Sequence, residues 1–233
     1  MHIWMQRYVA FLLEEIIMNN LAEFIDVLTR RKKSDLVFKN AKIINVFSHE
    51  IIEGNLAVHG DRIVGVGDFS GICEIDLCGA YISPGLMDAH VHIESSMLTP
   101  ENMANLVLPR GTTTIIADPH EIANVSGRRG IDYMLKATEN IPLNVFINLP
   151  SCVPATTFES SGAVLGADDL KEFIHHKRVL GLAEFMNFPG IVKKDPEVLK
   201  KLDLAHRNNK IIDGHAPNMD SNDIRTYAGV GIS

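Results

Sequence analysis

Two histidines separated by one residue, His90 and His92, are the side chains best suited to chemistry in this sequence. They lie at the end of an apolar stretch, Leu86 to Val91, which follows Pro84-Gly85 and is predicted to be a buried strand. Because residues two apart on a strand point to the same face, the two imidazoles should lie side by side at its carboxyl end. Such a pair can bind a divalent cation such as Zn²⁺, Mn²⁺ or Fe²⁺, although a lone His-x-His also occurs by chance.

Imidazoles and carboxylates also follow other predicted strands. They are Asp118-Pro119-His120-Glu121 after the second strand, Glu184 after the fourth and His215 after the fifth. In a (β/α)₈ barrel, catalytic groups gather at the carboxyl ends of the strands, so these side chains are expected to converge with the histidine pair on a metal site. Taken singly, Glu184 could instead be a helix-capping carboxylate, and His120 could cap a helix over 122–125.

Cysteine usage gives little support to a thiol chemistry. Cys152 follows the third predicted strand, but a nucleophilic thiol needs a base and an activating environment, so packing or pocket lining is the favoured interpretation. Cys73, Cys78 and Cys152 are odd in number and form no Cys-x-x-Cys pair. A disulfide framework or thiolate zinc site is therefore not expected, and a cytoplasmic location fits.

The overall composition is that of an ordinary globular protein. The chain has 233 residues, of which 46% are hydrophobic and 22% charged. Its net charge of −7 argues against a nucleic-acid partner. No apolar run reaches the ~18 residues of a membrane span, and the N-terminus is unlike a signal peptide, so no membrane association is expected.

Three segments are predicted along the chain. Residues 1–33 form an N-terminal extension with an amphipathic helix that ends at the basic cluster 30–33. Its apolar positions are Val9, Leu12, Leu13, Ile16, Ile17, Leu21, Phe24, Ile25 and Leu28. Residues 34–84 contain short β-type runs separated by turns such as His59-Gly60-Asp61, which predicts a small antiparallel unit, the N-terminal part of a β-sandwich domain.

Residues 85–233 alternate between strand and helix patterns. The predicted strands are 86–91, 112–117, 143–148, 179–183 and 210–213, with a sixth beginning at 228–233. The predicted helices are 100–108, 127–140, 167–175, 196–208 and 221–227, with Asp195 and Ser221 as N-caps. Repeated βα units predict an α/β fold with a parallel sheet, either the first half of a TIM-type (β/α)₈ barrel or a doubly wound sheet.

Four motifs resemble the amidohydrolase superfamily and, within it, the bacterial and archaeal adenine deaminases. They are Asp88-Ala89-His90-Val91-His92-Ile93-Glu94-Ser95-Ser96-Met97, Ala117-Asp118-Pro119-His120-Glu121-Ile122-Ala123-Asn124-Val125, Leu182-Ala183-Glu184-Phe185-Met186-Asn187 and Asp213-Gly214-His215-Ala216-Pro217. The motifs occur in family order, and the resemblance extends from about residue 20 to Ser233. It implies an incomplete TIM-type barrel preceded by part of a small β-sandwich domain.

The resemblance also implies a reaction and a metal site. The reaction is hydrolytic deamination of adenine to hypoxanthine and ammonia in purine salvage, with water attacking C6 of the base. The site is binuclear, with Mn²⁺ as the expected metal and Fe²⁺ or Zn²⁺ as alternatives. By match to the motifs, His90 and His92 hold one metal and His215 the other. Glu184 bridges the two metals, in place of the carboxylated lysine of many relatives, and His120 and Glu121 are further catalytic candidates.

Members of this family are more than twice as long as this chain. Their strand-six histidine, in Thr-Asp-His-Glu, and their strand-eight aspartate correspond to positions beyond Ser233. The sequence is therefore expected to be an N-terminal portion that is inactive by itself. Whether the intact protein is a homo-oligomer is left open.

Two other interpretations remain at this stage. One is another amidohydrolase, such as a cyclic amidase of the hydantoinase or dihydropyrimidinase type, which a lysine at the position of Glu184 would favour. The other is a non-catalytic remnant that serves only as a binding partner.

Overall fold

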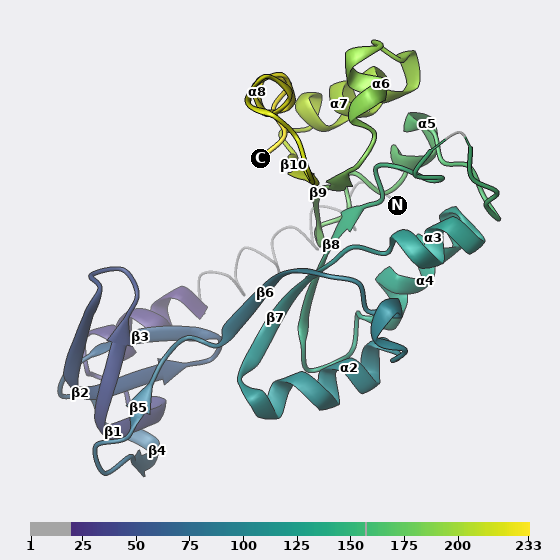
Figure 1. The fold of residues 1–233 in the computed structure, drawn as a ribbon. Helices are drawn as coiled ribbons and strands as arrows, with labels where there is room; N and C mark the ends of the chain where they lie inside the picture. The colour runs from purple at the N-terminus through teal and green to yellow at the C-terminus, as the bar shows by residue number, and fades with distance from the viewer. Residues whose placement is uncertain (1–19, 157) are drawn as a thin grey trace, which may run out of the picture. The chain divides into compact units, whose positions relative to one another are not determined.

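The structure is a computed structural model that describes residues 20–156 and 158–233. It divides into two compact units, with the boundary between Pro84 and Gly85 (Figure 1). The first part of the predicted N-terminal helix, including Val9 to Ile17, lies outside the described residues. Residues 20–28 are helical, and Val27 is the buried side chain of this short helix, whereas Leu21, Ile25 and Leu28 are exposed.

The first unit contains a single five-stranded sheet within the described residues. Its strands are β1 (Ser34–Asn45), β2 (Glu50–His59), β3 (Arg62–Val66), β4 (Gly71–Asp76) and β5 (Tyr81–Ile82), in the order β3-β2-β1-β4 with β5 also on β1. The β2–β3 turn is the predicted one, and Gly60 adopts a φ of 58° there, which a glycine does without steric cost. Ala41, Ile43 and Leu56 form a small core.

The expectation of an antiparallel unit is wrong for β4 and β5. β1, β2 and β3 pair antiparallel, but β4 and β5 pair parallel to β1. The chain leaves β3 at one edge and crosses to the other side of β1, so β4 enters in the same direction as β1. β4 was not among the predicted strands because its apolar residues, Ile72 and Ile75, are three apart and do not alternate.

The second unit is built on five parallel strands. They are β6 (Leu86–Val91), β7 (Thr112–Ala117), β8 (Asn144–Leu149), β9 (Val179–Phe185) and β10 (Ile211–Gly214), and they lie in the order β10-β9-β8-β7-β6 (Figure 1). Every neighbouring pair is parallel. Strands that follow one another in both sequence and space have no point at which the order reverses, so the winding is that of a barrel and not of a doubly wound sheet.

Helices connect the strands. They are α2 (Pro100–Val107), α3 (His120–Ser126), α4 (Arg128–Ala137), α5 (Ala167–Leu170), α6 (Phe188–Val192), α7 (Pro196–Arg207) and α8 (Ser221–Gly229), with 3₁₀ turns η1 (Glu94–Ser96) and η2 (Leu108–Arg110). Asp195 caps α7 as predicted, since its carboxylate accepts a hydrogen bond from the Glu197 amide at 2.9 Å. No helix among the described residues has the length and apolarity needed to cross a membrane.

Three details of the predicted helices and strands need correction. Asp220, and not Ser221, is the N-cap of α8, because its carboxylate accepts from the amides of Asn222 and Asp223. The helix predicted over 167–175 is regular only to Leu170. Residues 228–233 do not form a strand: α8 continues to Gly229, and Ser233 only begins to pair with the Ile212 carbonyl.

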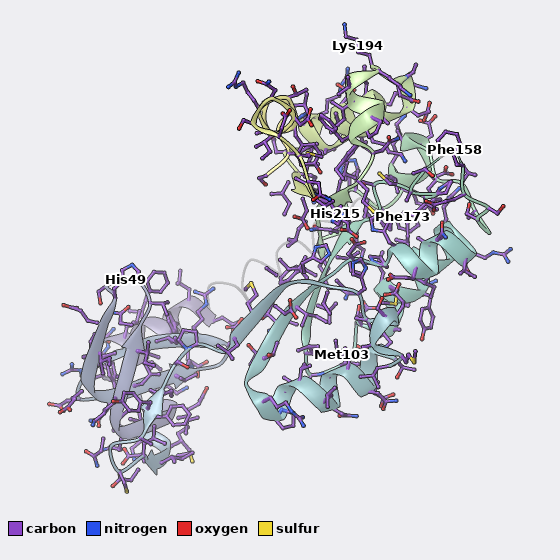
Figure 2. All side chains as sticks on the ribbon, in the orientation of Figure 1. His49, Met103, Phe158, Phe173, Lys194 and His215 are labelled. Atoms are coloured by element: carbon purple, nitrogen blue, oxygen red, sulfur yellow. The ribbon has the colours of Figure 1, made fainter. Side chains whose placement is uncertain are left out.

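The core of the second unit lies between the sheet and these helices. Ile115, Val145 and Ile147 from the strands are buried with apolar residues of the helices. Met103 on α2 and Phe173 after α5 are each 7% exposed and belong to this core, whereas Phe158, in the loop after β8, is 96% exposed (Figure 2). The opposite face of these strands carries apolar side chains such as Ile116 and Phe146 together with polar ones such as Asn148.

Candidate metal centre

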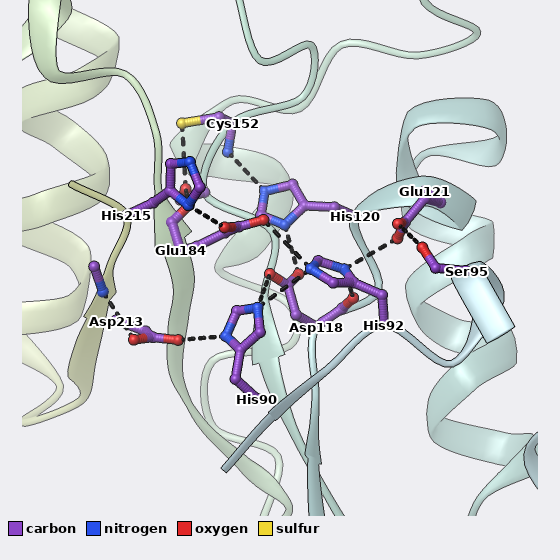
Figure 3. A network of polar contacts seen from close by, with 12 residues as sticks. His90, His92, Ser95, Asp118, His120, Glu121, Cys152, Glu184, Asp213 and His215 are labelled. Carbon is purple, nitrogen blue, oxygen red and sulfur yellow. Dashed lines mark hydrogen bonds and ion pairs between the residues drawn. The ribbon is translucent and has the colours of Figure 1, made fainter. Parts of the chain in front are cut away.

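His90 and His92, at the end of β6, face the end of β9. The two Nε2 atoms are 3.2 Å apart, and His92 Nε2 is 3.4 Å from Glu184 Oε1 (Figure 3). Alternation along the strand brings both imidazoles to the same face, as the spacing predicted.

His215 joins the group through Glu184. Its Nδ1 lies 2.8 Å from Glu184 Oε2, so one carboxylate oxygen faces His92 and the other faces His215 (Figure 3). Glu184 is the last but one residue of β9, and His215 directly follows β10. The helix-capping alternative for Glu184 has no support, because its carboxylate makes its contacts with imidazoles. The four side chains singled out from the sequence thus lie at one end of the sheet.

Asp118 is the residue that sequence reasoning left out of the ligand set. Together with His90, His92 and Glu184 it offers ligand atoms that all lie within 4.8 Å of one another. Its side chain is almost completely buried, and Oδ2, 3.9 Å from His90 Nε2, has no hydrogen-bond partner. Asp118 could have been identified from the sequence by its position directly after β7, because the other candidates also lie at the ends of strands.

The hydrogen bonds around the histidines fix which nitrogen is free. His90 Nδ1 donates to Asp213 Oδ2 at 2.8 Å, and His92 Nδ1 donates to the Asp118 carbonyl at 2.9 Å, with Glu121 Oε2 at 3.1 Å. In the neutral imidazoles each Nε2 therefore carries a lone pair, and the two Nε2 atoms face each other. Two acceptors at 3.2 Å, beside a buried carboxylate oxygen without a donor, fit a cation held among them.

His120 and Glu121 are brought to the site but contact other groups. His120 Nε2 accepts from the Cys152 amide at 3.4 Å, so Nδ1 carries the proton and donates to Asp118 Oδ1 at 2.5 Å. His120 therefore orients Asp118, and its contact with Cys152 is to the backbone and not to the thiol. Cys152 is buried, and His120 contacts its amide, so His120 does not act as the base that a nucleophilic thiol would need.

The carboxylates influence the ionisation of the site. Burial lowers the pKa of His92, but the charges of Asp118, Glu121 and Glu184 outweigh it and leave the pKa above the ordinary value. For Glu121, burial raises the pKa, but the hydrogen bond from Ser95 and the nearby His92 bring it below the ordinary value.

Tyr227 on α8 forms a hydrogen bond with the backbone of His215. Its hydroxyl accepts from the His215 amide at 2.8 Å and donates to the Phe185 carbonyl. Burial raises the pKa of Tyr227, so the phenol stays neutral and keeps its proton for donation. Nothing in the sequence pattern marked this residue, because its partners are 12 and 42 positions away.

Comparison with known proteins places this site in a family. Residues 81–232 match the model of the amidohydrolase family. The chain belongs to the amidohydrolase family. It is 58% identical over 201 residues to an adenine deaminase of Clostridium acetobutylicum, and 48% identical over 216 residues to adenine deaminase 2 of Carboxydothermus hydrogenoformans. These matches cover 86% and 93% of this chain but only 35% and 38% of the relatives, so the chain spans little more than a third of their length.

A solved structure supports the fold. The zinc-containing N-acyl-D-glutamate deacylase of Bordetella bronchiseptica superposes with a TM-score of 0.61 over 87% of this chain and 50% of that protein, at 14% identity. The second unit of this amidohydrolase is therefore an incomplete TIM-type barrel, as the sequence predicted.

Proposed function

We propose that this amidohydrolase chain is the N-terminal portion of an adenine deaminase, which hydrolyses adenine to hypoxanthine and ammonia in purine salvage. The observation that carries the substrate is the 58% identity over 201 residues to a protein named adenine deaminase. The reaction class, hydrolysis at a carbon–nitrogen bond, is common to the family and agrees with the imidazole and carboxylate set at the strand ends.

The proposed site is binuclear. His90 and His92 would hold one metal ion, His215 the other, and Glu184 would bridge them. The unpartnered oxygen of Asp118 supports its addition to this set. When bound, the divalent ions would supply a Lewis acid that polarises the attacking water. We propose Mn²⁺, with Fe²⁺ and Zn²⁺ as alternatives, because mixed imidazole and carboxylate ligands suit all three.

The chain's own residues would prepare this site before any substrate arrives. Asp213 accepts a hydrogen bond from Nδ1 of His90, and Glu121 accepts one from Nδ1 of His92. These hydrogen bonds would keep the Nε2 atom of each histidine directed at the metal centre. His120 holds one oxygen of Asp118 and leaves the other free. For His120 and Glu121 we therefore propose orienting roles, while the residues that contact the purine are not assigned.

The remaining parts of the proposal concern organisation. We assign 34–84 to the N-terminal part of a β-sandwich domain, 85–233 to the first half of the hydrolase barrel and 1–33 to an N-terminal extension. Adenine and water would be the small-molecule partners. A cytoplasmic location, and homo-oligomerisation of the intact protein as an open possibility, belong to the same proposal.

A cyclic amidase is the alternative that the site argues against. Its expected lysine would stand at position 184, where this chain has a glutamate whose two oxygens face His92 and His215. A non-catalytic remnant is the second alternative, and the experiment below separates it from an enzyme.

The test uses the full-length polypeptide that carries these residues, purified from manganese-supplemented cells. Ammonia release is measured with adenine, and opening of the ring to the N-carbamoyl acid is measured with hydantoin and with dihydrouracil, because hydrolysis of these cyclic amides liberates no ammonia. We expect ammonia from adenine and no ring opening of the cyclic amides. Ring opening would instead favour the amidase, and no reaction with any of the three by protein that retains its metal would favour the remnant.

A further inference from the structure

The turn after β8, formed by Ser151 and Cys152, contacts two sides of the proposed centre. Ser151 Oγ donates to the backbone carbonyl of Glu184 at 2.7 Å. The Cys152 amide donates to His120, which in turn donates to Asp118. The turn therefore fixes the backbone of Glu184 directly. It also fixes the side chain of Asp118, through the imidazole of His120.

A buried lysine holds this turn from outside the site. Lys201, on α7, is 8% exposed, and its Nζ donates to the Ser151 carbonyl at 2.8 Å. Burial lowers the pKa of Lys201, while the neighbouring Cys152 and, less strongly, the carboxylates of Glu197 and Asp169 act in the opposite direction. A lysine is rarely buried this far, because removing its ammonium from water is costly and an apolar side chain would fill the space more cheaply.

None of the proposed ligands contacts Lys201, so the site as described does not use it. Among the described residues, the ammonium of Lys201 donates to the carbonyl of Ser151, and the Ser151 hydroxyl donates to the carbonyl of Glu184. The same loop is also held at Val153 without Lys201, because the Leu165 amide donates to the Val153 carbonyl at 2.9 Å. Loss of the lysine should therefore loosen the turn locally while the fold remains intact.

We propose that Lys201 is a positioning residue for the metal centre: by fixing the Ser151 carbonyl it sets the separation of Glu184 from Asp118. This inference rests on the proposed function, because it needs a metal at the strand ends. In this arrangement a residue of helix α7 influences the positions of two carboxylates, Glu184 and Asp118, that lie at the ends of different strands. The effect passes through the turn and not through direct contact with substrate.

The test compares variants of the full-length polypeptide. Lys201→Met keeps the length and removes the donor, Lys201→Arg restores a donor, and Lys200→Met is the matched control, because Lys200 is an exposed neighbour on the same helix. Each protein is loaded with Mn²⁺, and metal release to a chelator is timed. The visible spectrum of the Co²⁺-loaded form is recorded at full occupancy.

We expect Lys201→Met to release metal about 10–100-fold faster, the range usual for groups that orient metal ligands, and to show an altered Co²⁺ spectrum. Lys201→Arg should be less impaired, and Lys200→Met should match wild type. If Lys201→Met does not fold, Ser151→Ala tests the same path by removing the hydroxyl that reaches Glu184, and the same faster release is expected.

Unchanged metal release and an unchanged spectrum in folded Lys201→Met, or in Ser151→Ala, would overturn the inference. If the wild type in the same experiment binds its metal and deaminates adenine, the proposed function remains supported although the role of Lys201 does not. A wild-type protein that binds no metal would overturn both. A metal-binding wild type that does not act on adenine would overturn only the substrate assignment.

Discussion

His90 Nδ1 and Asp213 Oδ2 lie 2.8 Å apart, although they come from β6 and β10, the two outermost strands of the five-stranded sheet. In a flat sheet these strands would be four inter-strand spacings of ~4.8 Å from each other. The contact shows that the sheet curls until the side chains of its opposite edges meet. That curvature is what brings ligands from distant parts of the sequence to one point.

The contact leads to a prediction for Asp213. Asp213→Ala should release the Nδ1 hydrogen bond that orients His90 and weaken metal binding about 10–100-fold. Asp203→Ala is the control, because Asp203 is exposed on α7 and pairs with Arg207 away from the site. Mn²⁺ titration of the full-length protein measures both. Equal affinity of the Asp213 variant and wild type would show that His90 needs no such partner.

Asp118→Asn tests the ligand that the sequence motif did not single out. Asparagine keeps the size of the side chain and an oxygen for His120, but it removes the charge from the buried, unpartnered position. We expect lower metal content after dialysis against a chelator, with the melting temperature of the metal-free protein unchanged or raised, since an unpaired buried charge is costly. Full retention of metal would remove Asp118 from the site.

Tyr227→Phe should destabilise the barrel portion by about 1–3 kcal/mol, because the His215 amide and the Phe185 carbonyl would both lose a buried partner. Urea unfolding followed by circular dichroism measures the change. Tyr133→Phe provides the matched control, because Tyr133 is 46% exposed. A loss no larger than that of the control would mean that water replaces the hydroxyl.

Residues 1–233 expressed alone should be poorly soluble and inactive. β6 and β10 are edge strands among the described residues, and Leu86 and Met87 on β6 are each 62% exposed. Apolar side chains on an unpaired strand edge favour association between copies. Light scattering and an ammonia assay with Mn²⁺ check this. A soluble monomer that deaminates adenine would contradict it.

Much of the barrel portion could be predicted because its strands are rich in apolar and β-branched residues and are followed by polar residues. The prediction that the strand from Leu86 to Val91 is buried is wrong, since five of its six residues are exposed at the edge of the sheet. β6 and β7 have the predicted bounds, and β8, β9 and β10 differ by one or two residues at their ends. β4 and the true N-cap Asp220 were missed, because the first lacks alternation and the second competes with an adjacent serine of equal capping tendency.

The site was predictable in part for a different reason. Position after a strand identifies His90, His92, Glu184 and His215, but it does not show which polar groups lack a partner. The roles of Asp118, Asp213 and Tyr227 depend on contacts with residues 2 to 123 positions away, which only the folded chain brings together. Lys201 reads as an ordinary surface residue of an amphipathic helix, and only its burial and its bond to Ser151 distinguish it.

We predict that the intact protein acts on the free base adenine in preference to adenosine. The prediction rests on the similarity to proteins named adenine deaminase, since no residue of this chain is assigned to the purine. Side-by-side ammonia assays on the full-length, manganese-loaded protein should give faster release from the free base. Faster release from adenosine would move the protein to a different group of deaminases.

The bridging role of Glu184 is tested by measuring ammonia release from adenine by full-length wild type and Glu184→Ala, with the metal content of each sample determined in parallel. Glu101→Ala, at an exposed position on α2, serves as the control. A carboxylate shared by two cations offsets their repulsion, so Glu184→Ala should lose bound metal and most of its activity, while the control keeps both. Near-normal turnover by Glu184→Ala with its full complement of metal would show that Glu184 does not bridge the metals.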